Sequence, residues 1–489
     1  MLQLTSANLK KVAIETLIVP VCADKEIHAD EAIVSIVRKA KKLKEFNGEK
    51  DEDVVFYKPS GLKAARVIFL GLGKLAKIDL ETLRSLAGKA VKKCIKMNLA
   101  KAYIAVPSAQ KIKKELPLLI EALLEGACLG NHLFDKYMQE KKHTPLKKIY
   151  FLAESGTVKK FSRLPSRIEA VCEGTVLARD WISMPPNEKR PQQFARLIVS
   201  RARKEKLVAK VMSEKELKQK KFGALLAVAA GSQSRPRMVV LEYKPKGAQK
   251  TVAFVGKGVT FDSGGINLKP SASLDDMKSD MSGAAAVAAT LITVARLKPR
   301  VNVIGAIPIV ENMPSGSASR PGDIIKSYYG KSVEISNTDA EGRLILIDAM
   351  SYVIKRYKPQ TLIDMATLTG ACIVALGEKI AGVFTGDDVL AEVIIASGQK
   401  THERCWRLPL PEDYKEQLKS DFADIGNMGK TRWGGAITAA LFLSEFVKDT
   451  RWAHIDIAGP AYAKMGNAYC NAGGTGFGVR LLCDLIDKL

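Results

Sequence analysis

Two polar segments in the second half of the chain combine acidic and basic residues at spacings that could bind cations. The first is a glycine-rich loop, residues 256–280, and it holds Lys257, Asp262, Lys269 and Asp280. The second, residues 336–343, holds Asp339, Glu341 and Arg343 at alternate positions. The first loop does not have the spacing of a phosphate-binding Walker motif. The second segment, taken alone, favours a helix start, with Asp339 as N-cap and Glu341 in the first turn.

If the four carboxylates of the two segments lie close together, the segments indicate cation binding rather than a simple helix start. At a separation of about 5 Å and an effective dielectric of about 20, each carboxylate pair repels by roughly 3 kcal/mol. The repulsion in the whole cluster is then roughly 20 kcal/mol, more than the stability of about 5–15 kcal/mol of a typical domain. Such a cluster must protonate or bind cations, and two divalent ions would cancel the four charges.

Each polar segment lies between an expected strand and an expected helix. Apolar runs predict strands at residues 67–70, 102–106, 238–243, 252–255, 303–309 and 361–363. Helical patterns occupy residues 81–97, 283–296 and 344–357. Strand-then-helix order predicts an α/β fold with a sheet covered on both faces. Ligands in such folds bind beyond the strand ends, where the two polar segments lie.

The length of 489 residues predicts more than one domain. Prolines 185, 186 and 191 interrupt regular structure. We predict a smaller N-terminal α/β domain at residues 1–160, a linker at 161–190 and a larger C-terminal catalytic domain at 191–489. The larger domain is expected to have a central mixed β-sheet flanked by helices. The Gly71–Lys74 segment lacks the third glycine of a dinucleotide-binding loop, so it predicts a tight turn.

Several features predict a cytoplasmic protein with no membrane segment. Residues 1–11 lack the basic start and apolar run of a signal peptide. The longest nearly apolar stretch, residues 283–295, is shorter than the about 20 residues that span a bilayer, and it predicts a core helix. The eight cysteines are scattered without a CxxC pair, as expected of reduced and mostly buried thiols.

The net charge of +24 is carried entirely by the first half of the chain. Residues 1–250 contain 50 Lys and Arg against 26 Asp and Glu, whereas residues 251–489 contain 26 of each. This excess suits either a solvated lysine-rich surface or an attraction to polyanions such as DNA. Lysine outnumbers arginine and no aromatic residues interleave with the basic runs, which favours the solvated surface; DNA binding remains the alternative.

The two polar segments resemble the signatures of the leucyl aminopeptidase family, the cytosol aminopeptidases. The hallmark string of that family is intact as Asn337–Arg343, and so is the Lys257–Gly265 stretch. Further similar pieces lie at residues 179–187, 366–371, 434–440 and 454–459. The resemblance covers residues 170–489, and the first third has the family's size and α/β character but little specific motif.

This resemblance implies a dimetal exopeptidase that releases N-terminal residues from peptides by a water or hydroxide bridging two metals. Asp262 and Glu341 would bridge the metals, Lys257 and Asp280 would complete one site, and Asp339 would complete the other. Lys269 and Arg343 would be the catalytic pair that does not bind metal, with a bicarbonate held at Arg343 as general base.

The residue types suit these implied roles. Lys257 can bind metal only as a neutral amine, so adjacent cations must lower its pKa. Lys269, left charged, can stabilise an oxyanion. Two divalent ions per subunit are expected. A mainly carboxylate ligand set suits Mn²⁺ or Mg²⁺, and Zn²⁺ remains open.

Substrate and assembly are also implied by the resemblance. The pocket for the first side chain is expected to contain Met277, Asn337, Leu368 and Gly370, with core packing as the alternative for Met277. One methylene changes binding by only about 1–3 kcal/mol, so the specificity should be Leu-like but broad. The expected partners are peptide substrates and five further copies in a homohexamer. His454 and Asp456 are predicted to be structural, and residues 473–478 a tight loop before the last helix.

Overall fold

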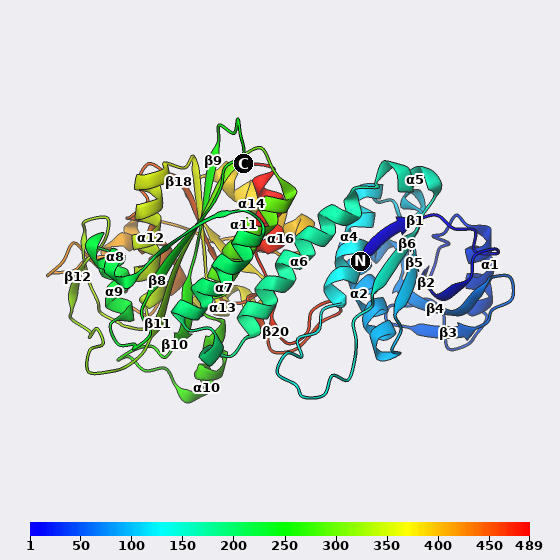
Figure 1. Ribbon diagram of the computed structural model, residues 1–489, viewed down its shortest axis with the longest axis horizontal. Helices are drawn as coiled ribbons and strands as arrows, with labels where there is room; N and C mark the ends of the chain where they lie inside the picture. Colours follow the sequence, from blue (N-terminus) through cyan, green and yellow to red (C-terminus); the bar gives the residue numbers. More distant parts are fainter. The chain divides into compact units, whose positions relative to one another are not determined.

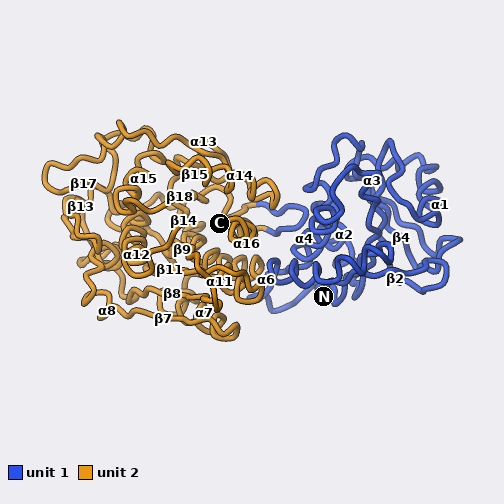
Figure 2. The backbone as a smooth tube through the Cα atoms, turned by 90° about the horizontal axis from the view of Figure 1, so that it is seen from above, with its two compact units in different colours: residues 1–172, 465–471 blue, residues 173–464, 472–489 orange.

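The computed structural model describes residues 1–489, which form two compact units (Figure 2). Unit 1 contains residues 1–172 and 465–471, and unit 2 contains residues 173–464 and 472–489. The chain passes from one unit to the other within helix α6, Leu164–Ser183. Both units are of the predicted α/β class, while the predicted domain bounds at residues 160 and 190 stay a prediction.

Unit 1 is built on one six-stranded sheet in the order β1-β6-β5-β2-β4-β3 (Figure 1). All neighbouring strands are parallel except β3, which is antiparallel to β4. The strands are β1 Leu2–Thr5, β2 Ile14–Cys22, β3 Asp53–Tyr57, β4 Ala64–Gly73, β5 Lys101–Ala105 and β6 Lys148–Leu152. The helices are α1 Glu31–Ala40, α2 Leu80–Lys96, α3 Ala109–Ile112, α4 Leu116–Gly130 and α5 Ser155–Lys160. The predicted strands at 67–70 and 102–106 and the helix at 81–97 are therefore confirmed.

Unit 2 is built on a mixed nine-stranded sheet, as predicted. Its order is β16-β15-β18-β14-β9-β11-β8-β7, with β10 paired to β11. The strands are β7 Val208–Met212, β8 Arg237–Tyr243, β9 Thr251–Gly256, β10 Gly258–Asp262, β11 Asn302–Asn312, β14 Thr361–Ala366, β15 Ala381–Phe384, β16 Cys405–Arg407 and β18 Arg451–Asp456. The four central strands, β18, β14, β9 and β11, are parallel. Their carboxyl ends therefore share one edge of the sheet.

Helices cover both faces of this sheet (Figure 1). Helix α12, Glu341–Tyr357, packs with Ile304 and Ala306 of β11 in one buried cluster. Gly305, between them, points to the other face, where an added Cβ would lie 2.8 Å from Leu291 of helix α11, Ser282–Leu297. The remaining helices of eight or more residues are α7 Pro191–Lys204, α14 Asp388–Thr401, α15 Gly435–Ser444 and α16 Val479–Ile486. Short helices are α8 Glu214–Gln219, α9 Gly223–Ala229, α10 Ser271–Leu274 and α13 Gly370–Leu376.

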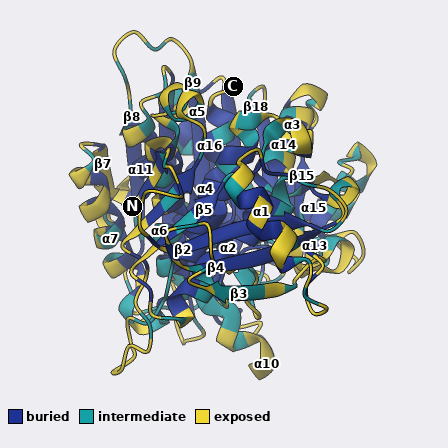
Figure 3. Ribbon diagram, turned by 90° about the vertical axis from the view of Figure 1, so that its right-hand side faces the viewer, coloured by how far each residue is buried: buried dark blue, intermediate teal, exposed yellow.

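The apolar stretch at 283–295 is the core helix that the sequence predicts. Residues 271–297 are long and apolar enough to cross a membrane, but 83% of their most apolar window is buried inside the protein. The central strands and the helix faces that pack on them are buried, whereas the edge strands β3 and β7, the loops and the outer helix faces are more exposed (Figure 3). All eight cysteines are buried, and none of them forms a disulfide.

Candidate active site

The polar segments of the sequence meet at the carboxyl edge of the central parallel strands. Lys257 directly follows β9, and Thr367 directly follows β14. Asn312 is the last residue of β11. On the helical side, Asp280 lies two residues before α11, and Glu341 is the first residue of α12. This edge is where ligands bind in open α/β sheets.

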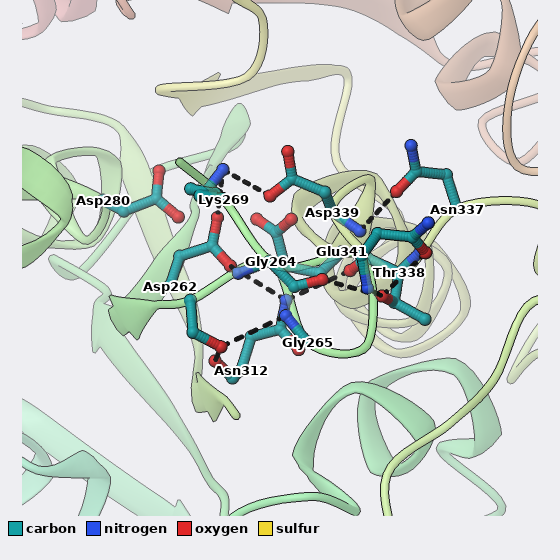
Figure 4. Close-up of polar contacts among 12 residues, drawn as sticks. Asp262, Gly264, Gly265, Lys269, Asp280, Asn312, Asn337, Thr338, Asp339 and Glu341 are labelled. Atoms are coloured by element: carbon teal, nitrogen blue, oxygen red, sulfur yellow. Dashed lines mark hydrogen bonds and ion pairs between the residues drawn. The ribbon is translucent and has the colours of Figure 1, made fainter. Parts of the chain in front are cut away.

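Three carboxylates converge at this edge. Asp262, Asp280 and Glu341 are buried and offer oxygen atoms that all lie within 4.8 Å of one another (Figure 4). The Lys257 ammonium lies 2.8 Å from Asp280 Oδ1 and 2.8 Å from Glu341 Oε1. It also donates a hydrogen bond of 2.8 Å to the carbonyl of Thr367.

A second lysine connects the fourth carboxylate to the cluster. Lys269 Nζ lies 2.8 Å from Asp262 Oδ2 and pairs with Asp339 Oδ1 (Figure 4). The N-cap interpretation of Asp339 is wrong, since the N-cap of α12 is Ala340 and no side chain caps that helix. The Asp339 side chain pairs with Lys269 instead.

A hydrogen-bonded loop structure holds the acids in place. Asp262 Oδ1 accepts hydrogen bonds from Gly264 N at 2.9 Å and from Asn312 Nδ2 at 2.8 Å. Asn312 Nδ2 also donates to the carbonyl of Thr338 at 3.1 Å. Thr338 Oγ1 in turn donates to the carbonyl of Gly264 at 2.7 Å. Asn312 and Thr338 therefore join the two polar segments, and the hydrogen bond from Thr338 to Gly264 spans 74 positions in the sequence.

The electrostatics of the cluster reflect burial and mutual repulsion. Burial and then the Asp262 carboxylate raise the pKa of Glu341 to about 8. Burial raises the pKa of Asp280 to about 6, although Lys257 opposes the shift. Burial alone would lower the pKa of Lys257, but Asp280 and Glu341 outweigh it and raise that pKa. Two ammonium groups face four acids, so the cluster is not neutralised by the protein itself when all are ionised.

The chemistry of these donors fits a cation. Asp280 Oδ2 is buried and accepts no hydrogen bond from any protein group. Buried polar atoms are nearly always paired, so such an oxygen needs a partner. Carboxylate oxygens at this spacing are the ligands that hard divalent cations prefer.

Arg343 lies on α12, two residues after Glu341. It is buried, and its Nη1 donates to the carbonyl of Asn427 at 2.7 Å. Its Nε has no hydrogen-bond partner in the protein. Burial lowers the pKa of Arg343 to about 10, against the opposing effect of Glu341 and Asp456.

The four residues predicted for the substrate pocket all surround the same edge. Met277 lies on the 3₁₀ turn Asp275–Ser279 and is half-buried, as is Leu368, while Gly370 is the exposed first residue of α13. Asn337 Oδ1 accepts a hydrogen bond of 2.7 Å from Asp339 N, so this end of its side chain braces its own loop. The pocket role of the four residues stays a prediction.

Matches to family models identify the family to which this chain belongs. The catalytic-domain model of the cytosol aminopeptidase family matches residues 176–483, and the family's N-terminal-domain model matches residues 20–141. The chain belongs to the cytosol aminopeptidase family. A probable cytosol aminopeptidase of Chlorobium limicola is 41% identical over 510 residues, covering 100% of this chain and 99% of its own. One of Cenarchaeum symbiosum is 42% identical over 441 residues, covering 89% and 88%.

A solved structure confirms the fold. The bottromycin maturation enzyme BotP in complex with Mn superimposes with a TM-score of 0.87 at 33% identity, covering 97% of this chain and 99% of that chain. The protein is thus an aminopeptidase, a hydrolase that acts on the N-termini of peptides.

Some residues of this aminopeptidase site were missed by the sequence analysis. Asn312 ends a long apolar strand, and a polar residue at a buried strand end was a usable signal. Asn427, which accepts from Arg343 and donates to the carbonyl of Asn337 at 2.8 Å, follows a two-residue strand that gives no pattern.

Two residues predicted to be structural are deeply buried. Asp456 accepts from Leu368 N at 3.1 Å and from Thr369 Oγ1 at 2.7 Å, so it braces the loop after β14. His454 Nδ1 lies 2.6 Å from Asp364 Oδ1. Asp456 thus contacts the loop after β14, and His454 contacts strand β14 itself. These contacts are what a structural role predicts.

Proposed function

We propose that this aminopeptidase releases N-terminal residues with the help of two divalent cations held by the buried acids. Asp262 and Glu341 would be shared by both cations, Lys257 and Asp280 would serve one, and Asp339 the other. The single observation that carries the proposal is the meeting of Asp262, Asp280 and Glu341 within 4.8 Å, in a place with an unpaired carboxylate oxygen.

The cations, when bound, supply a nucleophilic water at neutral pH and a positive charge for the developing oxyanion. Lys257 must give up a proton before its amine can join the ligands, and adjacent divalent charge favours that loss. Its ion pairs with Asp280 and Glu341 keep the amine at the required position until then.

Two basic residues would take part in catalysis without binding a cation. Lys269 would move its ammonium from Asp262 and Asp339 toward the scissile carbonyl and polarise it. Arg343 has no usable proton to give. Its buried Nε, which lacks a protein partner, would instead orient a small anion such as bicarbonate to act as the general base.

The substrate pocket would be formed by Met277, Asn337, Leu368 and Gly370. Leu368 packs beside the apolar cluster of unit 2, which favours an apolar first side chain such as leucine. The identity of the metal is proposed to be Mn²⁺, with Zn²⁺ and Mg²⁺ as alternatives, because BotP has been solved with Mn and the ligands here are mainly carboxylates.

We also propose a cytoplasmic location and a homohexameric assembly. The first is supported by the names of the relatives, which are cytosol aminopeptidases, and the second by family resemblance alone. DNA binding through residues 1–250 stays a prediction that rests on their charge. DNA binding predicts that the protein binds duplex DNA and that this binding weakens steeply as salt rises. Retention on DNA that shows no sequence preference and disappears at modest salt would favour the solvated lysine-rich surface.

The proposal is tested with leucine anilide as substrate, using enzyme stripped by a chelator and then restored with Mn²⁺, Zn²⁺ or Mg²⁺. Glu341→Gln should lower kcat by about 10²–10³-fold or more, since a metal supplies several kcal/mol of transition-state stabilisation. The matched control is Glu392→Gln, an exposed glutamate on α14 of the same unit. Stripped enzyme that retains full activity, or Glu341→Gln enzyme with normal turnover, would sink the proposal.

A further inference from the structure

Unit 1 contains a crevice that the aminopeptidase chemistry does not use. It has a volume of about 760 Å³, within the range of small-molecule sites. All its lining residues belong to unit 1, whereas the acidic cluster belongs to unit 2. The crevice is therefore a separate feature that needs its own explanation.

The crevice lies at the carboxyl ends of four parallel strands. Ser6 follows β1, residues 153–155 follow β6, residues 106–110 follow β5, and residues 28–30 lie between β2 and α1. These strands are neighbours in the order β1-β6-β5-β2. The carboxyl edge of a parallel sheet is where α/β folds bind their ligands.

The walls of the crevice are held in place by hydrogen bonds. Ser108 N donates to the carbonyl of Ile27 at 2.8 Å, which ties the loop after β5 to the loop after β2. His28 Nε2 lies 2.6 Å from the carbonyl of Pro20, and Lys111 Nζ donates to the His28 carbonyl. Asp30 Oδ1 accepts from Ala32 N at 2.8 Å and caps α1. The site is thus formed before any ligand arrives.

The charge of the lining differs from the charge of the first half of the chain. Among its 19 residues the ionised side chains are Asp30 and Glu154, and none is a lysine or arginine. This absence is notable because residues 1–250 carry 50 Lys and Arg against 26 Asp and Glu. His28 adds no positive charge, since burial lowers its pKa. The Lys111 ammonium is bound to the His28 carbonyl and is not part of the lining, so no lining side chain offers a cation to a phosphate or a carboxylate.

The uncharged lining residues supply two further kinds of contact. Hydroxyl and amide groups come from Ser6, Asn8, Ser108, Gln110, Ser155 and Thr157. Apolar contact comes from Leu9, Ile33, Leu116 and Leu152. We propose that this crevice binds a small organic cation in which primary ammonium groups face Asp30 and Glu154 and a short alkyl chain lies on the apolar residues.

The test uses the full-length, metal-loaded enzyme and putrescine, a diamine without a peptide bond, in isothermal titration calorimetry. Wild type should bind one putrescine per chain at this site. The double variant Asp30→Asn, Glu154→Gln should weaken that binding at least tenfold, and asparagine preserves the helix cap. The matched control removes two exposed unit 1 carboxylates outside the crevice, Glu45→Gln and Glu140→Gln, and should bind as wild type.

A second variant tests the cavity itself. Ala29→Trp, at an exposed lining position, should block binding without a change in charge. The proposal is overturned if putrescine gives no binding at about 10 mM, or if it binds the double variant as tightly as wild type. Binding that is lost only in Glu341→Gln would assign putrescine to the acidic cluster and also overturn it. Preferential binding of AMP or inorganic phosphate over putrescine would contradict the proposed ligand class.

Discussion

Gly342 lies between two proposed site residues, Glu341 and Arg343, and its lack of a side chain leaves room for Lys257. A methyl group at Gly342 would lie 2.6 Å from Lys257 Cε and 2.8 Å from its Nζ. Alanine would raise the helix propensity of α12 by up to about 1 kcal/mol. It would nevertheless displace the buried amine from Asp280 and Glu341. We therefore expect Gly342→Ala to lose at least tenfold in kcat/KM, whereas its Tm should change little because the gain in helix propensity and the loss of buried ion pairs oppose each other.

The matched control for Gly342→Ala is Gly156→Ala. Gly156 is also the second residue of its helix, α5, and nothing lies within 4 Å of an added Cβ. That variant should keep wild-type activity. An active Gly342→Ala enzyme would mean that Lys257 need not occupy its present position.

Asn312 is expected to act through Asp262 rather than on substrate. Its Nδ2 donates to Asp262 Oδ1 and to the carbonyl of Thr338, so it orients a proposed ligand and the loop that carries the others. Removal of such outer partners costs about 10–100-fold in metal affinity. Asn312→Leu should raise the Mn²⁺ concentration for half-maximal activity by that factor, with kcat largely restored at saturating Mn²⁺. Asn302→Leu, at the other end of β11, serves as control, and an equal shift there would contradict the positioning role.

At the scale of elements, the predicted strands and helices of unit 2 are present because burial on both faces leaves uninterrupted apolar runs. The helix predicted at 344–357 begins three residues earlier, at Glu341. The first residue of this helix is thus also a proposed cation ligand. The strand order could not be predicted: β9 pairs with β11 and with β14, and nothing local in Thr251–Gly256 specifies either partner. For the same reason, the spacing of Asp262 and Glu341 in the sequence could not predict that they lie close together. That prediction needed the resemblance to the family signatures.

Lys189 contacts the end of helix α6 in a way that the sequence could not predict, because lysine is rarely buried. This side chain is fully buried after α6, and its Nζ donates to the carbonyls of Trp181 at 2.9 Å and Ile182 at 2.7 Å. Burial, with a smaller effect of Lys278, lowers its pKa well below the ordinary value. The amine thus satisfies carbonyls at the end of the helix in place of a glycine cap.

The depressed pKa of Lys189 predicts a pH-dependent stability. Between the lowered pKa of the folded amine and the unfolded pKa of about 10.4, the unfolded chain holds a proton that the folded amine has lost. Stability from this group therefore rises with pH, by up to about 1.4 kcal/mol per unit while the folded amine stays neutral. As pH rises toward the unfolded pKa, the Tm of wild type should therefore increase relative to that of Lys189→Met. Lys204→Met, at an exposed lysine, should show no such trend, and parallel pH profiles for Lys189→Met and wild type would show that Lys189 is charged in the folded protein.

At the scale of the whole molecule, the two units should respond differently to cations. The acidic cluster joins the last residue of β10 to the starts of α11 and α12, all in unit 2. A ligand that binds only the folded state at a hundred times its Kd stabilises it by about 2.7 kcal/mol. Hydrogen exchange in Mn²⁺ should consequently slow in residues 257–280 and 337–343, with little change in residues 1–172.

Glu341→Gln provides the control, because it removes one proposed ligand and leaves the surface of unit 1 untouched. In that variant, Mn²⁺ should no longer slow exchange in either segment of unit 2. Equal protection of both units by Mn²⁺ would instead indicate binding to scattered surface acids, since unit 1 has no buried carboxylate group that matches the cluster. The contrast between the two units therefore separates a built cation site from general electrostatic binding, independently of any activity measurement.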